Sequence, residues 1–275
     1  MKRALVTGSG GFMGSWLVPE LKKKYSVQEL DEKSGKSILH LGDLEIDFNL
    51  VFHLAGISFV PDAAKNPYKA FQVNSFGTLN VLEAVRKQDA KLIFPSTYLY
   101  GQPKKLPISE SHPLSPASTY ARSKLIAEHL ILQYHEDYGL PYAILRFFNI
   151  YGPGQSEKFL IPKIVAGVKA GTLQLFDKAP KRDFTFITDA VQAYIKAAAS
   201  KKSGTYNIGS GKSYSVSEIV EMAKRISGKK CVVAYSAERR KNEIMDCVAD
   251  AGKAKRELNW SPKVGIEEGM RRMYG

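Results

Sequence analysis

The N-terminal stretch constrains the fold of this chain more than any other part. A short apolar run, Arg3 to Thr7, leads directly into Gly8-Ser9-Gly10-Gly11-Phe12-Met13-Gly14, and apolar residues at helical spacing follow. A strand, a glycine-rich turn and a helix in this order are the context of a dinucleotide-binding turn. There the backbone approaches a diphosphate closely and offers helix N-terminal N–H groups to its charge. We therefore favour cofactor binding by Gly8, Gly11, Phe12, Met13 and Gly14 over a purely structural glycine loop.

A second strand is predicted to end at Asp31. An acidic residue about 20 residues beyond the turn accepts hydrogen bonds from the adenosine ribose of NAD and repels the extra phosphate of NADP. Asp31 therefore favours NAD, although Lys33 lies close by. Two further strands are expected over Ser37–Leu41 and Leu50–Gly56, with His53 as a core residue of the latter.

Only five residues separate Leu44 from Leu50, between these two strands. A parallel crossover normally needs a dozen or more residues and often a helix. Five or six extended residues span roughly 20 Å at best. The sequence therefore predicts that the crossover helix is absent and that a face of the sheet is exposed there.

A candidate acid/base pair lies in Tyr120-Ala121-Arg122-Ser123-Lys124. Residues four apart share one face of a helix, so Tyr120 and Lys124 can point into one cavity. A nearby ammonium favours the phenolate, and we expect Lys124 to lower the pKa of Tyr120 from its usual value near 10. Tyr100 and Lys104 have the same spacing, but Gly101 and Pro103 lie between them and predict a loop.

Composition sets the remaining bounds. With 275 residues, 44% of them hydrophobic, the chain suits one large α/β domain, alone or with a small lobe. Its two cysteines fit neither a disulfide scaffold nor a zinc site. Without a leader sequence or a window of about 18 apolar residues, we expect a cytoplasmic protein with no membrane partner. The net charge of +13 is spread in small groups of lysines, which favours steering of an anionic substrate over binding of nucleic acid.

Several segments follow the glycine turn in a characteristic order: VFHLAG, VNSFGTLNVLEA, FPSTYLYG, YARSK, RFFNIYGPGQ, RDFTFITDAVQA, TYNIGSG and ADAGKAKRELNWSP. In this order the chain resembles the extended short-chain dehydrogenases/reductases over nearly its whole length. The resemblance implies an α/β fold, with a Rossmann doubly wound parallel sheet and a small C-terminal substrate-binding lobe. We expect the Rossmann domain at 1–150, joined by 183–200, and the lobe at 151–182 and 201–275.

The resemblance also implies roles for individual residues. Along the cofactor it places Asp43 and Leu44 at the adenine, Leu54, Ala55 and Gly56 beneath the cofactor, Asn74 below the nicotinamide, and Lys124 at the ribose. At the substrate it places Ser96 and Thr97 at the reacting hydroxyl, Tyr120 as acid/base, Asn149 at the sugar or its phosphate, and Arg182 and Arg240 at the diphosphate. Arg239 is an alternative to Arg240, and Ser96 is alternatively a residue that caps its own turn.

The reaction class depends on the two positions after Ser96, which here are Thr97 and Tyr98. Dehydratases of the resembling family carry Asp-Glu there, and decarboxylases carry Glu at the second position. Neither residue here is an acid at neutral pH, although Glu110 is a possible substitute. The resemblance therefore implies a homodimeric NAD-dependent epimerase of a nucleotide sugar, with a UDP-sugar inverted at C4 through a 4-keto intermediate. The alternatives are an NADPH-dependent 4-keto-sugar reductase, a catalytically silent dinucleotide sensor and, last, a nucleic-acid binder.

Overall fold

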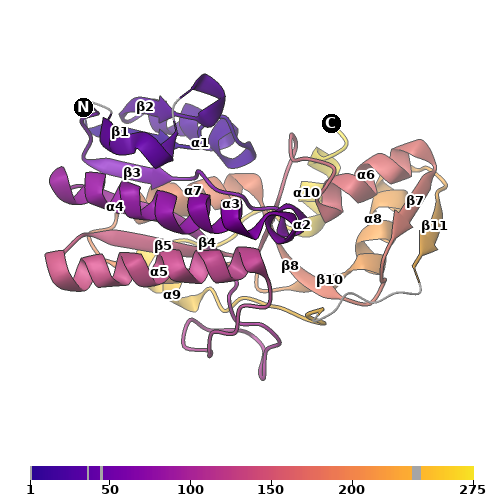
Figure 1. Cartoon of the computed structure of the whole chain (residues 1–275). Coiled ribbons are helices and arrows are strands. Elements are labelled where there is room, and N and C mark those ends of the chain that lie inside the picture. Colours follow the sequence, from indigo (N-terminus) through magenta and orange to yellow (C-terminus); the bar gives the residue numbers. More distant parts are fainter. Residues whose placement is uncertain (1, 36, 44–45, 237–242) are drawn as a thin grey trace.

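The main part of the molecule is a six-stranded parallel sheet with helices on both faces (Figure 1). The computed structural model describes residues 2–35, 37–43, 46–236 and 243–275. The strand order is β2-β1-β3-β4-β5-β9. These strands are β1 (Arg3–Thr7), β2 (Ser26–Leu30), β3 (Leu50–His53), β4 (Lys91–Thr97), β5 (Tyr142–Phe147) and β9 (Gly204–Ile208). This arrangement confirms the expected doubly wound α/β fold.

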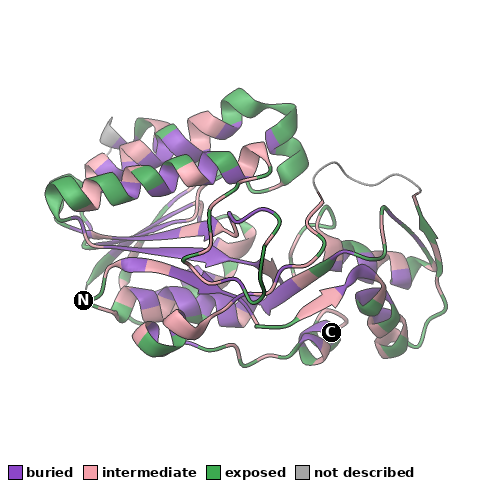
Figure 2. Cartoon of the chain, turned by 90° about the horizontal axis from the view of Figure 1, so that it is seen from below, coloured by how far each residue is buried: buried purple, intermediate pink, exposed green. Residues whose placement is uncertain are grey.

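Each face of this sheet has its own hydrophobic core. One face packs against α1 (Phe12–Lys22), α7 (Ile187–Ala199) and α9 (Gly252–Leu258). The other packs against α4 (Gly77–Lys87) and α5 (Thr119–Tyr138). Figure 2 shows the consequence, because most of the sheet is buried while the helices keep an exposed outer side. The carboxyl ends of the parallel strands therefore meet at one edge, where ligands bind in such folds.

A second, smaller part of the chain forms the lobe (Figure 1). It contains a three-stranded sheet in the order β10-β8-β6 and a two-stranded sheet of β11 and β7. The elements are β6 (Asn149–Tyr151), α6 (Leu160–Ala170), β7 (Thr172–Leu175), β8 (Lys181–Phe186), β10 (Ser213–Ser215), α8 (Val216–Ser227), β11 (Val232–Tyr235) and α10 (Ile266–Arg272). Their apolar side chains share a third hydrophobic core.

The predicted domain division differs from the structure in two segments. Phe184 and Phe186 of β8 were expected in the Rossmann domain, but β8 pairs with β6 and β10 and these side chains lie in the lobe core. Residues 201–275 were expected in the lobe, but β9 pairs with β5 in the main sheet. Leu258 and Trp260 are also buried in the core under α7, and the Trp260 indole donates to the Asp189 carbonyl at 2.9 Å. The last strand of the main sheet thus comes from beyond position 200. The rest of the division stays a prediction.

The link between β2 and β3 shows one prediction right and two wrong. Among its described residues there is no α-helix, as expected, only the 3₁₀ turns η1 (Glu32–Ser34) and η2 (Ile38–Asp43). The expected third strand at Ser37–Leu41 is wrong, because most of these residues lie in η2. Ile38 and Leu41 lie on either side of a kink at His40, and both side chains are buried.

The expected exposed sheet face is wrong as well. Ile38, Leu41 and Phe48 pack over Leu5 and Val51, and all five side chains are buried. The short link therefore replaces the crossover helix as the cover of the sheet. It leaves β2 as the edge strand.

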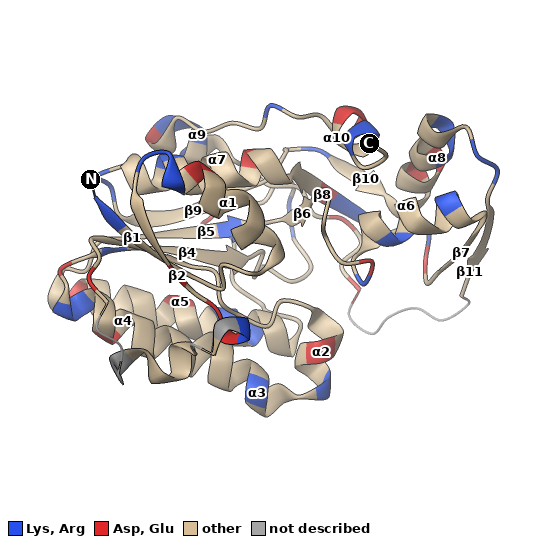
Figure 3. Cartoon of the chain, turned by 90° about the horizontal axis from the view of Figure 1, so that it is seen from above, with Lys and Arg blue, Asp and Glu red and all other residues tan. Residues whose placement is uncertain are grey.

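The charged side chains are distributed over both parts of the molecule. Figure 3 shows Lys and Arg spread over helix ends and loops of both parts, mixed with Asp and Glu. Among the helices of the described residues, none combines the length and apolar character that crossing a bilayer requires. The same residues hold no group of three or more His, Cys, Asp or Glu side chains arranged to bind a metal ion.

Candidate active site

The glycine turn between β1 and α1 is so tight that Gly8 and Gly14 have no room for a side chain. Gly8 has φ +69°, and a Cβ built on it would lie 2.6 Å from the Ala55 nitrogen. A Cβ on Gly14 would lie 2.2 Å from the Ser9 carbonyl oxygen. The Gly11 N–H donates to the Gly8 carbonyl at 3.1 Å, just before α1 begins. The turn therefore has the geometry predicted for a dinucleotide site, with free space in front of a helix N-terminus.

A cavity of about 690 Å³ opens against this turn. Its wall contains Gly8, Gly10, Gly11, Leu54, Ala55 and Gly56, all on or beside the carboxyl ends of β1 and β3. Asp31 lies on the rim, where Oδ2 accepts the Gly10 N–H at 2.9 Å and Oδ1 accepts the Lys33 N–H at 3.0 Å. Lys33, Lys65 and Lys69 also line the cavity. The lining thus joins a backbone cradle for a diphosphate, a carboxylate for a ribose and several cations.

Asp43 and Leu44 are the two predicted adenine contacts, and the structure describes only part of them. Asp43 ends η2, whose first two residues, Ile38 and Leu39, line the cavity. The Asp43 side chain and Leu44 lie outside the described residues. Phe12 and Met13 begin α1 and pack in part against the lobe core.

Gly56, Asn74 and Lys124 meet at one end of the cavity wall. A Cβ on Gly56 would lie 2.9 Å from the Asn74 Oδ1 atom and 3.7 Å from the Lys124 Nζ atom. Asn74 lies in a π-helical turn, η3 (Gln72–Phe76), and is buried. Its Oδ1 accepts the Ile57 N–H at 2.8 Å, and its Nδ2 donates to the Ile57 carbonyl at 3.0 Å. Asn74 therefore holds the wall of the cavity in place through both ends of its amide.

Tyr120 and Lys124 lie in the first two turns of α5, as predicted. The Ser118 side chain caps this helix by accepting the Ala121 N–H at 3.1 Å. Lys124 is buried, with its Nζ atom 4.3 Å from the centre of the Phe94 ring. Burial lowers the pKa of Lys124 to about 7, and the charge of Glu128 offsets part of this effect. Lys124 can therefore change its protonation near neutral pH.

The predicted effect of Lys124 on Tyr120 is wrong for the protein by itself. Burial raises the pKa of Tyr120 above 10, the neighbouring Tyr98 raises it further, and only the Thr97 side chain lowers it. Desolvation disfavours both the phenolate and the ammonium, so the two groups do not sustain an ion pair here. Tyr120 is thus a neutral phenol until a further positive charge arrives.

Ser96 lies near the carboxyl end of β4, next to Thr97 in sequence. It is 4% exposed, and its Oγ atom has no hydrogen-bond partner in the described residues. The alternative of a turn cap is therefore not seen. A buried hydroxyl without a partner costs about 1–3 kcal/mol, and in a native structure it calls for an explanation such as a ligand. Ser96 has the character expected of a group that awaits a substrate.

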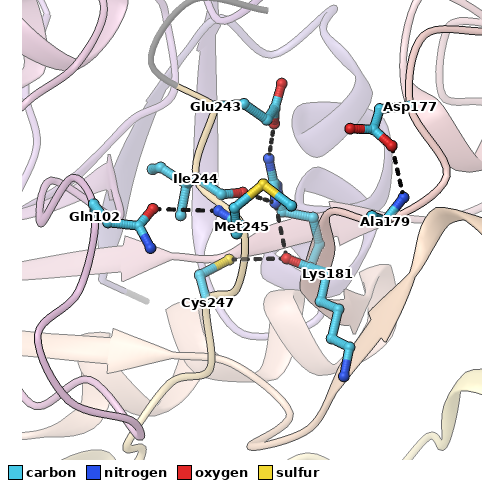
Figure 4. Close-up of polar contacts among 9 residues, drawn as sticks. Gln102, Asp177, Ala179, Lys181, Glu243, Ile244, Met245 and Cys247 are labelled. Carbon is cyan, nitrogen blue, oxygen red and sulfur yellow. Dashed lines mark hydrogen bonds and ion pairs between the residues drawn. The ribbon is translucent and has the colours of Figure 1, made fainter. Parts of the chain in front are cut away.

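Arg182 does not project freely toward a substrate. It forms an ion pair with Glu243 and donates to the Ile244 and Lys181 carbonyls at 2.6 and 2.8 Å (Figure 4). The same close-up shows Cys247 and Gln102 beside this cluster. Arg182 is therefore held by the chain's own groups. Arg240 and its alternative Arg239 lie outside the described residues.

The remaining candidates have structural partners. The Asn149 amide donates to the Asp183 carbonyl at 3.1 Å and ties β6 to β8. Glu110, the alternative proton donor, accepts the Asn207 N–H at 2.8 Å and so anchors β9. His53 is a core residue, as predicted: it is fully buried between Thr7 and Thr78, and burial lowers its pKa to about 3.

One loop was predicted correctly, and one buried ion pair was not predicted. Tyr100 and Lys104 lie on a loop, as expected from Gly101 and Pro103. The buried ion pair of Glu128 and Arg146, whose Oε2 and Nη2 atoms are 2.6 Å apart, was not predicted. The available signal was an acid four residues after Lys124 in the same helix.

Comparison with known proteins agrees with this geometry. A family model described as GDP-mannose 4,6 dehydratase matches residues 31–273. A putative UDP-glucose 4-epimerase of Methanocaldococcus jannaschii is 32% identical over 305 residues, which cover 98% of this chain and 96% of that protein. The chain belongs to the extended short-chain dehydrogenase/reductase family.

Other members of the family differ in reaction class. A GDP-6-deoxy-D-mannose reductase of Pseudomonas aeruginosa is 30% identical, over 98% of this chain and 95% of the reductase. Among solved structures, the Thermotoga maritima UDP-glucose 4-epimerase with UDP-glucose has a TM-score of 0.93 at 29% identity, covering 98% of this chain and 97% of that one. The Thermus thermophilus UDP-glucose 4-epimerase with NAD has a TM-score of 0.89 at 28% identity, covering 99% of each chain. The present chain thus matches epimerases and a reductase over nearly its whole length.

Proposed function

We propose that this protein is an NAD-dependent epimerase that inverts C4 of a nucleotide-diphosphate sugar, most specifically a UDP-sugar. The observation that carries this proposal is the buried, unpartnered hydroxyl of Ser96, followed by Thr97 and Tyr98 instead of acids. Reversible oxidation of one carbon needs a group that orients a hydroxyl and a group that moves its proton. Elimination of water needs an additional acid, and Glu110 already holds the backbone of β9. The UDP-sugar epimerases named above support the same reaction.

The cofactor cavity fits NAD. The glycine turn and the α1 N-terminus would hold the diphosphate, and Asp31 would accept hydrogen bonds from the adenosine ribose. When bound, NAD supplies the hydride acceptor and a positive charge. Lys124 is buried and has no ion-pair partner within the described residues, so its donors are available to a ribose hydroxyl. NAD in the Thermus thermophilus epimerase supports this assignment.

The proton moves through Tyr120. Ser96 would orient the C4 hydroxyl of the sugar, and the Tyr120 phenolate would take its proton as the hydride leaves C4. A neutral Tyr120 cannot act in this direction, so the charges brought by Lys124 and the cofactor have to lower its pKa. Tyr120 would return the proton to the same oxygen once the 4-keto sugar presents its other face to the bound cofactor. Reaction at the opposite face gives the C4 epimer with no net redox change.

Substrate binding would exchange one anion for another at Arg182. The guanidinium suits a diphosphate because it can bind two oxygens at once. In the structure Glu243 occupies this group. We infer that the substrate diphosphate replaces the Glu243 carboxylate on Arg182, with Asn149 on the neighbouring strand β6 close to the same ligand.

The test is a product assay. Purified protein, catalytic NAD and UDP-glucose or UDP-N-acetylglucosamine should give the C4 epimer, detected by proton NMR, without accumulation of NADH. A 4-keto-6-deoxy sugar, or carbon dioxide from a UDP-uronate, would contradict the epimerase. A protein that binds NAD tightly but turns over none of these sugars would be the silent sensor.

A reductase is the second candidate, favoured by the lysines that line the cofactor cavity. Lys33, Lys65 and Lys69 are placed where they would attract an additional phosphate of NADP. The reductase of Pseudomonas aeruginosa named above supports this alternative. Oxidation of NADPH on addition of a 4-keto-6-deoxy nucleotide sugar, faster than oxidation of NADH, would establish it.

We also propose that two copies of the chain pair through the outer sides of α4 and α5. The two helices pack side by side, and several large apolar side chains on or beside them are exposed. These are Phe76 at 64%, Ile126 at 43%, Leu132 at 39% and Tyr138 at 58%. Ile126→Lys with Leu132→Lys should convert a dimer to a monomer in analytical ultracentrifugation. A wild-type monomer at micromolar concentration would contradict this arrangement.

A cytoplasmic location is part of the same proposal. Both cysteines, Cys231 and Cys247, carry free thiols. Free thiols suit a reducing compartment, as does an intracellular nucleotide-sugar substrate. Fractionation of cells that make the natural protein would test this location.

A further inference from the structure

The catalytic helix is fixed to the main sheet by one buried ion pair. Arg146 of β5 binds Glu128 of α5 through Nη2 to Oε2 at 2.6 Å and Nε to Oε1 at 3.0 Å. The side chains are only 7% and 1% exposed. A bidentate guanidinium–carboxylate contact fixes orientation as well as distance. The pair therefore sets both the depth and the rotation of α5 on the sheet.

The pair joins α5, which carries Tyr120 and Lys124, to β5, the strand next to the one that carries Ser96. Glu128 is one helical turn after Lys124 and two turns after Tyr120 on α5. Arg146 is directly opposite Ser96 in the register of β4 and β5. A displacement of α5 relative to β4 would therefore separate Tyr120 from Ser96.

A second set of bonds extends the pair away from the reacting groups. Arg146 donates from Nη1 to the Tyr100 hydroxyl at 3.0 Å, and Tyr100 donates to the Asn207 Oδ1 atom at 2.6 Å. Both partners are buried. The guanidinium is thus locked by contacts on β9 and on the loop after β4, so it cannot follow α5 if the helix moves.

The pair also determines the charge that Lys124 meets. Phe94 of β4 faces its ammonium, Gly56 and the neutral amide of Asn74 lie against it from the cavity wall, and His53 of β3 is neutral at working pH. Tyr120 on the same helix is also neutral. Glu128 is the one carboxylate whose charge raises the pKa of Lys124 among the described residues, and Arg146 is its ion-pair partner.

We propose that Glu128 and Arg146 are positioning residues of the active site, which hold Tyr120 and Lys124 against Ser96 and set the charge beside Lys124. This rests on the proposed function, because it takes those three side chains to be the reacting set. It adds that two residues that touch neither cofactor nor sugar set both the geometry and the charge state of the centre.

The experiment compares Glu128→Gln, Arg146→Gln and the double variant. The readout is the pH at which NAD affinity falls, followed by calorimetry on the sugar-free protein, with the pH profile of kcat alongside. Loss of the carboxylate should move the midpoint down and loss of the guanidinium should move it up, by about 0.5–1 pH unit for a charge one helical turn away. The double variant should bring the midpoint back toward that of wild type while kcat stays reduced at least tenfold.

Two controls separate positioning from general damage. Glu268→Gln breaks the exposed pair of Glu268 and Arg272 on α10 and should change neither midpoint nor kcat. Glu128→Asp keeps the charge and shifts the contact, so it should keep the wild-type midpoint and lose kcat. If Arg146→Gln does not fold, Glu128→Gln and Glu128→Asp still decide the question.

The outcomes are distinct from those of the function test. Midpoints that stay fixed, or that move in the same direction in both single variants, would overturn the charge role. An unchanged kcat in the double variant would overturn the positioning role. NAD binding does not depend on the identity of the sugar, so failure of the epimerase assay leaves the midpoint measurement intact.

Discussion

The Asn74 side-chain amide donates to the Ser123 hydroxyl at 2.9 Å, and that hydroxyl donates to the Tyr120 carbonyl at 2.8 Å. Because Asn74 also holds Ile57 in the cavity wall, the wall and the first turn of α5 share one polar residue. Ser75 adds a second tie, since its hydroxyl donates to the Ser123 carbonyl at 3.0 Å. The π-helical turn that presents Asn74 therefore connects the cofactor cavity to the acid/base residue.

Tyr120→Phe should abolish turnover while NAD and UDP still bind. The substitution removes only the ionisable oxygen, and general acid–base catalysis contributes about 10²–10⁴ in rate. We expect kcat to fall at least 100-fold, with dissociation constants from calorimetry nearly unchanged. A variant that keeps more than a tenth of wild-type kcat would exclude Tyr120 as the acid/base.

Ser96→Ala should reduce turnover without loss of stability. Its hydroxyl has no partner in the described residues, so its removal costs no internal hydrogen bond and can raise the free energy of unfolding. Loss of a donor at a reacting oxygen lowers kcat by about 10²-fold. Thr185→Val is the matched control, because the Thr185 hydroxyl of β8 is also buried and unpartnered. Urea unfolding should treat the two variants alike, whereas only Ser96→Ala should affect kcat.

Asp31 should determine the choice between NAD and NADP. Its carboxylate faces the cavity from the rim and is fixed by the Gly10 N–H. We expect the wild-type protein to bind NAD more tightly than NADP. Asp31→Asn should narrow this preference roughly tenfold, because a hydrogen bond to a charged group contributes about 1.5 kcal/mol or more. Titration of both cofactors by fluorescence quenching measures it, and tighter binding of NADP to wild type would favour the reductase.

Glu243→Gln should tighten the binding of UDP. The variant keeps the size of the side chain but removes the charge that occupies Arg182. We expect roughly tenfold higher affinity, since about 1.4 kcal/mol corresponds to a factor of ten. Glu221→Gln is the control, because the exposed Glu221 carboxylate of α8 pairs with Lys224 and not with Arg182. Weaker UDP binding by Glu243→Gln would mean that the carboxylate itself touches the nucleotide.

The cofactor-free protein should become more stable as the pH rises above 7, and Lys124 should be the cause. The folded pKa of Lys124, about 7, lies below the unfolded value of 10.5, so between these values the unfolded state binds the extra proton. The free energy of unfolding should rise with pH by up to about 1.4 kcal/mol per unit from this group. Lys91, lowered to about 8 by burial, contributes only at higher pH. Lys124→Met should therefore flatten the curve from pH 7 to 8 in urea titrations, and an unchanged slope would refute the assignment.

The sequence was sufficient to predict the parts of the site that depend on local geometry. Gly8 and Gly14 were identified because a strand, a glycine-rich turn and a helix follow one another, and Tyr120 with Lys124 because a helix brings residues four apart together. Ser96 was identified by resemblance, and the structure gave it a physical property, an unpartnered hydroxyl, that no spacing contains. These features need little information from the rest of the fold.

The failures concern contacts between distant segments. The pKa of Tyr120 depends on burial by the whole site, which outweighed the local effect expected from Lys124. Arg182 was predicted at the diphosphate, which stays a prediction, but its partner Glu243, about sixty positions away in sequence, was not predicted. The expected third strand failed because Ile38 and Leu41 gain burial over Leu5 as a 3₁₀ turn. In each case a non-local partner decided the outcome.

The position of β2 has a consequence for how the molecules coexist at high concentration. With no further strand beyond it in the described residues, one row of its backbone N–H and C=O groups faces outward. Such a row can recruit a strand from another molecule and begin aggregation. Ser26, Gln28 and Glu29 are exposed along β2, and Glu29 pairs with Lys22 at 2.7 Å. The short link to β3 thus leaves β2 without a neighbouring strand on one side, and the exposed polar and charged side chains of β2 oppose self-association there.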